Sequence, residues 1–407
     1  MAARPLIYLD NNATTRVDEA VVQSMVPFFG EHYGNAASRH AAGSMARAAV
    51  DIARGQVAAL VGAEQEEVYF TSGATESINL ALKGMAEALA PRGRHIITAA
   101  TEHRAVLDTC DHLAAAGFRL TLLSVDRAGM VDPGSLRRAL REDTILVSIM
   151  AANNEIGTLA PLRELAAICR DAGTIFHSDA TQAAGRIPID LGEIPVDLLS
   201  LSAHKMHGPK GIGALVVRRR RGMPKPVAQV HGGGHEQGLR SGTANVPAIV
   251  GFGKAAALAR VRMDDDALLT RRLRDHLVDG LRARVPGVSL NGHERERLPH
   301  TASLTFAGVR ADRLLSVLPD IAASTGSACS SARPEPSHVL RSIGLTQEEI
   351  LSTVRFGVSR FTRIEELDTA VTRIADAVAG LREESRAGIE KRATNESAEL
   401  LEGKHHA

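Results

Sequence analysis

The sequence contains no tryptophan, and aromatic residues make up only 3% of its 407 residues. Modules that bind nucleic acids by stacking bases on aromatic side chains need more of them. No charge sign dominates either, because 48 basic residues face 47 acidic ones and the formal net charge is +1. This balance gives no electrostatic reason to bind bulk nucleic acid or an anionic membrane surface. We therefore expect no direct nucleic-acid binding and no membrane partner.

Long apolar runs and disulfide patterns are also missing. No run approaches the roughly 18 apolar residues of a membrane-spanning helix, and the first residues, Met1–Pro5, lack the apolar core of a signal peptide. Cys110, Cys169 and Cys329 are too few, and odd in number, for a disulfide framework. We therefore expect a cytoplasmic protein.

The length predicts two structural domains. We expect a large domain over residues 15–260. A smaller domain would combine residues 1–14 with 261–382 and carry a loop over 323–337. Residues 383–407 form a polar tail in which we expect little order.

Short apolar runs alternate with helical patterns in the predicted large domain, which indicates a mostly parallel sheet covered by helices on both faces. The predicted strands are Glu67–Thr71, His95–Ala99, Arg119–Ser124, Thr144–Met150, Thr174–Ser178, Asp197–Leu201 and Gly213–Val217, with helices near 75–90, 104–116, 133–141 and 161–172. A long charged helix near 262–285 would lead to an α+β unit with strands Ala302–Phe306 and Thr353–Val358 and helices Arg313–Leu318 and Ile364–Leu381.

Polar clusters follow five of the predicted strands directly. They are Ser72–Glu76, Thr101–Arg104, Asn153–Glu155, Asp179–Gln182 and Ser202–Lys205. One such cluster means little, because loops are generally polar. Ligands of open parallel sheets bind at the carboxyl ends of the strands, so all five clusters together predict one pocket.

The clusters offer complementary chemistry, each with a plainer alternative. Lys205 at a strand end can form a Schiff base if its amine is neutral, or it is a solvated loop lysine. Amides and hydroxyls of Ser72–Thr75 can hold a phosphate at a helix start, or Ser72 or Thr75 caps the helix. Asp179 can pair with a protonated ring nitrogen, or it caps the next short helix. His103 can stack on a planar group or move protons, or it is structural. Together these groups describe a pyridoxal-phosphate site.

Motifs along nearly the whole chain extend this picture. They are Tyr8–Thr15, Thr71–Ser77, Thr101–His103, Asn153–Glu155, Asp179–Gln182, His204–Lys205, His231–Glu236, Arg240–Thr243, Thr325–Cys329 and Arg355–Phe361. In this order they resemble the class V branch of the fold-type-I pyridoxal-phosphate enzymes, and specifically cysteine desulfurases of the NifS/IscS type. The resemblance implies an α/β fold, with a large sheet sandwiched by helices and a smaller α+β domain.

The resemblance also implies roles for individual residues. Lys205 would bind the cofactor and move the substrate α-proton, and His103 would stack on the ring and act on the thiol proton. Asp179 would pair with the pyridinium nitrogen, Gln182 with the phenolic oxygen, and Asn154 would lie near that oxygen and the substrate. The phosphate would be surrounded by Ala74, Thr75, Ser202 and His204. Thr243 would reach the phosphate of a second subunit, which implies a homodimer with shared sites. Arg355 would clamp the substrate carboxylate.

Cys329 distinguishes desulfurases from other members of the resembled family. It lies among small, polar and proline residues, typical of a mobile loop, and six or seven extended residues reach roughly 20 Å. Cys110 and Cys169 have apolar neighbours and read as buried small hydrophobic residues. The long loop resembles the first group of desulfurases, which deliver sulfur to varied acceptors.

The implied reaction converts L-cysteine to L-alanine and leaves a persulfide on Cys329. The sulfur acceptor would be an iron–sulfur scaffold or a thiolation carrier. No intrinsic metal is expected, although Cys329 could transiently ligate an iron–sulfur cluster with a scaffold partner. A selenocysteine lyase, a class V aminotransferase and a non-catalytic scaffold remain as alternatives.

Two features depart from the resembled pattern or stand outside it. Ala36 and Ser303 occupy positions where proline and asparagine are common, and we expect neither to touch the chemistry. Arg218–Arg221 is a run of four arginines after a strand. We read it as a solvated edge, with a docking patch for an acidic partner or tRNA as the alternative.

Overall fold

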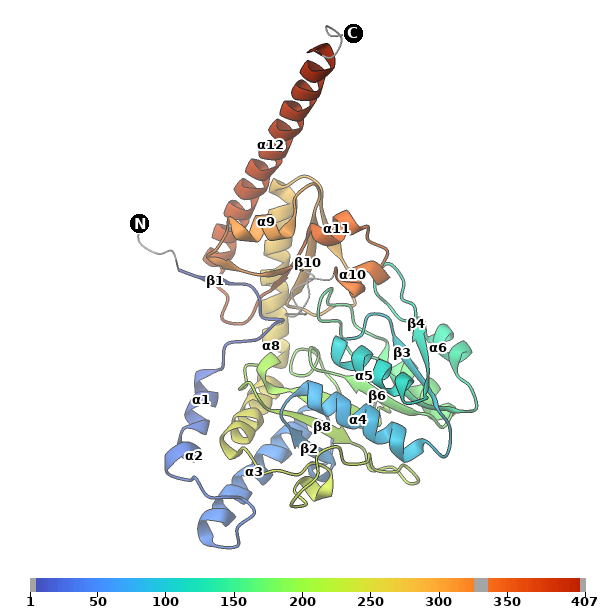
Figure 1. Cartoon of the computed structure of the whole chain (residues 1–407). Coiled ribbons are helices and arrows are strands. Elements are labelled where there is room, and N and C mark those ends of the chain that lie inside the picture. The colour runs from blue at the N-terminus through green and yellow to red at the C-terminus, as the bar shows by residue number, and fades with distance from the viewer. Residues whose placement is uncertain (1–4, 326–335, 403–407) are drawn as a thin grey trace.

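The computed structural model describes residues 5–325 and 336–402, and its centre is a seven-stranded sheet in the order β2-β8-β7-β6-β5-β3-β4 (Figure 1). The strands are β2 (Val68–Thr71), β3 (His95–Ala99), β4 (Arg119–Leu123), β5 (Thr144–Ser148), β6 (Ile175–Asp179), β7 (Leu198–Ser202) and β8 (Gly213–Val217). Strands β3 to β7 pair in parallel, whereas β8 pairs antiparallel with both β7 and β2. All seven predicted strands and the mostly parallel sheet are confirmed.

Helices cover both faces of this sheet because side chains alternate along each strand. In β2, Val68 and Phe70 belong to one hydrophobic cluster, while Tyr69 between them belongs to another. The first cluster takes in α3 (Ala41–Leu60), α6 (Pro133–Ala139) and α7 (Leu162–Asp171). The second takes in α4 (Ala74–Leu89) and α5 (Arg104–Ala115), which lie side by side. The four helices predicted within this region are confirmed, and α3 was not predicted.

A second, smaller sheet is antiparallel, in the order β12-β13-β10-β9. Its strands are β9 (Val288–Asn291), β10 (Thr301–Phe306), β12 (Ser324–Thr325) and β13 (Thr353–Gly357). A short parallel pair, β1 (Ile7–Tyr8) with β11 (Ile321–Ala322), brings the N-terminal segment to this region. The remaining short helices are α1 (Glu19–Met25), α2 (Pro27–Gly30), α9 (Ala311–Ser316), α10 (His338–Ser342) and α11 (Gln347–Leu351), with 3-10 turns η1 (Gln65–Glu67), η2 (Ala203–Lys205) and η3 (Glu236–Gly238).

One long helix, α8 (Val246–Arg284), connects the two sheets. Phe252 in its first half packs in the core of the large sheet, and Leu277 in its second half packs in the core of the small sheet. The sequence predicted only the charged second half of α8, near residues 262–285. The first half is mostly apolar and lacks the charged face that indicates a helix. The predicted domain boundaries stay a prediction. Two hydrophobic cores joined by α8 support them.

The predicted irregular tail after residue 382 was wrong for most of its length. Helix α12 (Ile364–Glu402) continues through it and projects from the rest of the molecule in Figure 1. Residues 382–402 contain no proline and are rich in alanine, glutamate and arginine, which favour helix. None of the helices that the structure describes combines the length and apolar character needed to cross a membrane.

Candidate active site

A cavity of about 580 Å³ lies at the carboxyl ends of the large-sheet strands. Four of the five polar clusters supply side chains that line it together: Thr75, His103, Asp179, Gln182, Ser202, His204 and Lys205. The fifth, Asn153–Glu155, contributes Asn154 to this set, so every predicted cluster is represented. The convergence predicted from the sheet edge is confirmed.

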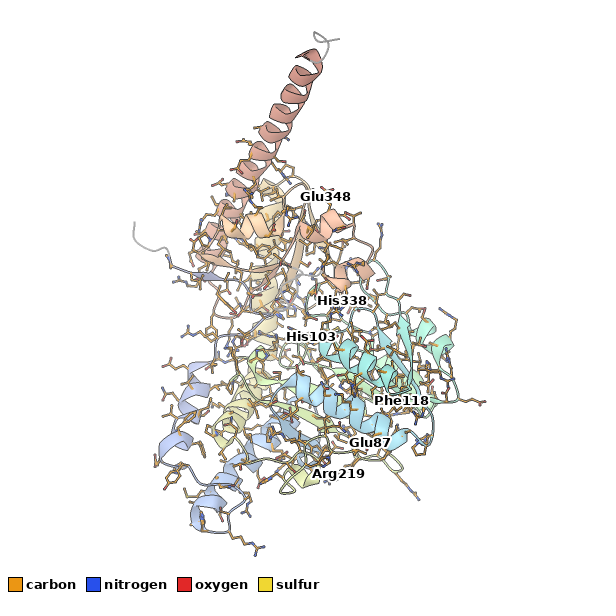
Figure 2. The ribbon with its side chains drawn as sticks, in the orientation of Figure 1. Glu87, His103, Phe118, Arg219, His338 and Glu348 are labelled. Atoms are coloured by element: carbon orange, nitrogen blue, oxygen red, sulfur yellow. The ribbon has the colours of Figure 1, made fainter. Side chains whose placement is uncertain are left out.

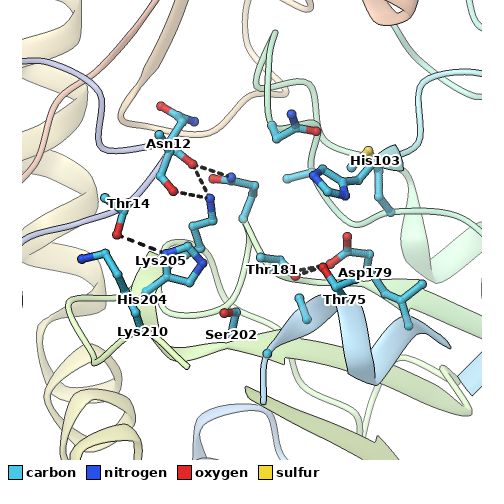
Figure 3. A pocket seen from close by; sticks show the side chains of 18 of the residues that line it. Asn12, Thr14, Thr75, His103, Asp179, Thr181, Ser202, His204, Lys205 and Lys210 are labelled. Atoms are coloured by element: carbon cyan, nitrogen blue, oxygen red, sulfur yellow. Dashed lines mark hydrogen bonds between the residues drawn. The ribbon is translucent and has the colours of Figure 1, made fainter. Parts of the chain in front are cut away.

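Lys205 ends the short turn η2 that follows β7. Its ammonium donates to the carbonyl oxygens of Asn12 at 2.6 Å and Ala13 at 2.8 Å (Figure 3). Arg186 fixes the backbone at this point by donating to the Lys205 carbonyl at 2.9 Å. The alternative of an untethered, solvated loop lysine was therefore wrong.

His103 lies at the start of α5 and both caps the helix and lines the cavity. Its Nδ1 accepts from the Ala105 amide at 3.1 Å, so the neutral ring carries its hydrogen on Nε2. Burial lowers the pKa of His103 below its ordinary value; Asp179 opposes this effect and Lys205 adds to it. The ring is therefore neutral at neutral pH. His103 has the structural role that was the alternative, as a helix cap, and it also lines the cavity.

Asp179 is the last residue of β6 and is only 3% exposed. Its carboxylate accepts from the amide of Thr181 at 2.9 Å and from the Thr181 hydroxyl. This is the local bond expected of a cap, but the residues that follow form turns and no helix. A buried acid that also lines the cavity is placed to meet a cationic ligand atom.

The start of α4 presents backbone amides to the cavity. Gly73 occupies the capping position and no side chain makes a capping hydrogen bond there, so the alternative in which Ser72 or Thr75 caps the helix was wrong. First-turn amides such as those of Ala74 and Thr75 have no acceptor within the helix. Both residues line the cavity, and such a helix start attracts anions.

His204 and Ser202 flank the same end of the cavity. His204 Nδ1 lies 3.1 Å from the Thr14 hydroxyl (Figure 3). Burial, with Lys205 and Lys210 nearby, lowers the pKa of His204 to about 4. The ring is therefore a neutral hydrogen-bonding group beside two lysines, a setting that suits a bound anion.

Two cavity-lining amides have oxygens that no described residue satisfies. The side-chain oxygens of Asn12 and Asn154 are buried and lack a hydrogen-bond partner within residues 5–325 and 336–402. Gln182 is held in place, since its Nε2 donates to the Asn12 carbonyl at 3.0 Å. Buried polar groups without partners are rare, so these oxygens indicate a ligand with polar hydrogens.

Arg355 reaches the cavity from the small sheet. Its guanidinium donates to the Asn154 carbonyl at 3.1 Å and pairs with Asp10 at 3.0 Å. Ser303 and Ser324 lie directly opposite it on the neighbouring strands β10 and β12. Strand pairing brings position 303 beside Arg355, but Ser303 is not among the residues that line the cavity, so the expectation that it does not touch the chemistry stays a prediction.

Two predicted residues lie elsewhere. Thr243 is exposed and lines a different cavity, of about 390 Å³, with Arg47 and His235. Cys329 and most of the predicted loop lie outside the described residues. Cys110 and Cys169 are buried free thiols, as predicted, and burial raises the pKa of each to about 12.

The N-terminal residues of the cavity were not predicted individually. Asn12, Ala13 and Thr14 line it, and Asp10 pairs with Arg355. Their sequence could have indicated a place in the site, because they form a polar run directly after a short apolar segment and lie in the motif Tyr8–Thr15.

Two of the four arginines in the run Arg218–Arg221 form ion pairs with buried acids. The interpretation of the run as a solvated edge was therefore wrong for these two residues. Arg218 pairs with Glu67 at 3.2 Å and Arg220 with Asp197 at 3.4 Å, and both acids are buried. Arg219 and Arg221 are exposed. Alternation along the extended chain explains why every second arginine turns toward the sheet.

Comparisons with known proteins identify relatives of this chain. Residues 7–369 match the family described as aminotransferase class-V. A cysteine desulfurase IscS from Anaeromyxobacter sp. (strain Fw109-5) is 50% identical over 380 residues, covering 93% of this chain and 94% of the relative. A solved NifS-like protein superimposes with a TM-score of 0.86 at 39% identity, covering 92% of this chain and 99% of its own. The solved protein SspA, in complex with cysteine, has a TM-score of 0.78 at 34% identity and covers 88% of this chain and 100% of its own. The chain therefore belongs to the class V aminotransferase family and, within it, to the pyridoxal-phosphate-dependent cysteine desulfurases.

Proposed function

We propose that this chain takes the sulfur of L-cysteine, holds it as a persulfide on Cys329 and passes it to an acceptor protein, with L-alanine as the other product. The observation that carries the proposal is the cavity in which Lys205, His103 and Asp179 from the large sheet meet Arg355 from the small one. The related protein SspA, solved in complex with cysteine, supports this substrate.

The cavity fits pyridoxal phosphate. Asp179 would meet the pyridinium nitrogen, and Gln182 with Asn154 would meet the polar groups of the ring and the substrate. The phosphate would lie at the start of α4, held by Ala74, Thr75, Ser202 and His204. The unsatisfied oxygen of Asn154 supports this fit. When bound, the cofactor supplies a sink for electrons released at the α-carbon of an amino acid.

The chain's own residues would then handle atoms and protons of the substrate. Lys205 takes and returns the proton at the α-carbon. Arg355 holds the substrate carboxylate, a task that suits the paired donors of a guanidinium. His103 handles the thiol proton. The Cys329 thiolate attacks the substrate sulfur, so that a sulfur–sulfur bond forms as the carbon–sulfur bond breaks. The electron pair of the broken bond stays with the carbon fragment, whose β-carbon takes a proton and becomes the methyl group of alanine.

A homodimer with shared sites is part of the proposal. Thr243 is exposed and lies outside the cavity that contains Lys205. A role at a phosphate therefore requires the cavity of another subunit. Its place on the surface beside Arg240 and Gly242, in a separate cavity, supports such a contact.

We propose an iron–sulfur scaffold or a thiolation carrier as acceptor, and transient ligation of a cluster by Cys329 in a scaffold complex. The cytoplasm is the proposed compartment, because Cys329 has to remain a thiol to accept sulfur.

The test compares alanine, sulfide and protein persulfide formed from cysteine by the wild type and by Cys329→Ala, with Cys169→Ala as a control at a buried thiol. Loss of persulfide and sulfide in Cys329→Ala alone is expected. Unchanged sulfide release by Cys329→Ala would contradict the persulfide step. Selenide release from selenocysteine without cysteine turnover would favour a lyase, and keto-acid formation would favour an aminotransferase.

A further inference from the structure

The start of helix α10 is fastened to the wall of the active site by a buried hydrogen bond. Ser337 caps this helix by accepting from the Leu340 amide at 3.1 Å, and its hydroxyl donates to Glu155 Oε2 at 2.5 Å. Ser337 and Glu155 are 4% and 5% exposed, so water competes little for this bond.

Glu155 belongs to the same turn as Asn154, which lines the cavity. The turn is tied together by Asn153, whose Oδ1 accepts from the amides of Glu155 at 2.8 Å and Ile156 at 3.0 Å. Between them, the carbonyl of Asn154 accepts from Arg355. A displacement of Glu155 would therefore reach the carbonyl that holds the Arg355 guanidinium.

A second bond fastens α10 one residue further on. His338 Nε2 lies 2.8 Å from the carbonyl oxygen of Glu102, the residue before His103. Figure 2 shows His338 close to His103 in this view, and burial, with a smaller contribution from His103, lowers the pKa of His338. Thus Ser337 and His338 hold two different loops of the site, each next to a residue with a proposed role.

The chain segment between Ser324 and Ser337 contains Cys329. Its upstream end, Ser324, lines the cavity and pairs with Arg355 across the sheet. Its downstream end is Ser337. Both ends are thus fixed beside groups proposed to bind the substrate.

We propose that Glu155 is a positioning residue for sulfur transfer, which fixes Ser337 and thereby the downstream end of the Cys329 segment against the Asn154 turn. The inference rests on the proposed function, since it assumes that Cys329 accepts the sulfur. Burial raises the pKa of Glu155 to about 7, against the opposing effects of Ser337, Arg355 and Arg104.

The test separates binding of cysteine from transfer of its sulfur in the loaded enzyme. Ser337→Ala should slow single-turnover persulfide formation on Cys329 by roughly 10- to 100-fold, the cost of a small misplacement of a reacting group. The affinity for cysteine, read from the change in cofactor absorbance, should stay within about twofold. Thr346→Ala is the matched control, since Thr346 caps the neighbouring short helix α11 and its bonds lie within that helix start. It should leave both quantities unchanged.

A paired substitution tests the contact itself. Ser337→Asp keeps a capping oxygen but sets a second carboxylate against Glu155, so it should slow transfer as well. Adding Glu155→Gln supplies an amide donor to that carboxylate and should restore most of the rate. Transfer at the wild-type rate in Ser337→Ala, or no recovery in the double variant, would overturn the proposal.

These experiments distinguish a failure of the proposed function from a failure of the positioning role of Glu155. If Cys329→Ala still releases sulfide normally, the persulfide step is wrong regardless of Ser337. If Cys329→Ala is inactive and Ser337→Ala is normal, only the positioning role is wrong.

Discussion

The two sheets supply the same cavity in different ways. The large sheet contributes Asp179 and Ser202 from the ends of β6 and β7, which are adjacent parallel strands. The small sheet contributes Arg355 from the middle of an antiparallel strand, and this side chain is held by Asp10 and by the carbonyl of Asn154. The partners of Arg355 lie 345 and 201 residues away in the sequence.

This difference shows which parts of a site follow from a general rule. Parallel strands that end at one edge bring their following loops together in any protein of this class. No such rule brings the centre of β13 to that edge, since its position depends on the packing of α8 and of the N-terminal segment. We therefore expect the large sheet to provide the proton transfers at the substrate α-carbon, and Arg355 of the small sheet to provide selectivity for the substrate.

The largest effect should come from the large sheet. Lys205→Ala should lower the rate of alanine formation by about 10³-fold or more, because both the proton transfer and the anchoring amine are lost. Alanine production, together with the absorption band of the bound cofactor, measures this. Lys225→Ala, an exposed lysine outside the cavity, should change neither. Substantial activity in Lys205→Ala would contradict the assignment of the α-proton transfer to this lysine of the large sheet.

A smaller effect, confined to substrate binding, is expected from the small sheet. Arg355→Lys keeps the charge but loses the paired donors, so KM for cysteine should rise roughly 10- to 100-fold with a smaller change in kcat. Steady-state kinetics measures both. Arg363→Lys is the control, because Arg363 is exposed and, within residues 5–325 and 336–402, its guanidinium pairs with the nearby Glu366. A fall in kcat with KM unchanged would place Arg355 in the chemistry.

The smallest effect should arise where the two regions meet, at Glu155. Because burial raises the pKa of this acid to about 7 from 4.5, the protonated form is favoured on folding. The resulting stabilisation is present below pH 4.5 and is lost as pH rises through 7. Denaturation of the wild type and of Glu155→Gln at a series of pH values should show the wild type losing about 3 kcal/mol relative to the variant. A difference that does not change with pH would mean that folding leaves the pKa of Glu155 unshifted.

The sequence predicts those site residues that lie directly after strands of the large sheet, at its carboxyl edge. Thr75, His103, Asp179, Ser202 and Lys205 were all found from polar residues after apolar runs, and they line one cavity. Arg355 was identified only through the family resemblance, since nothing local sets it apart from other arginines. The arginine run was misread because its acidic partners, Glu67 and Asp197, precede other strands.

The sequence by itself determined the seven strands, the helices between them and the edge at which a ligand binds, because hydrophobic periodicity and the alternation of strands and helices along the chain are local properties. Only the tertiary structure decided that the carbonyls of Asn12 and Ala13 hold Lys205, that Ser303 and Ser324 flank Arg355, and that Ser337 bonds to Glu155. Each of these contacts joins segments more than a hundred residues apart in the chain or pairs strands of the second sheet. Such contacts depend on how the two cores pack around α8, which no local pattern records.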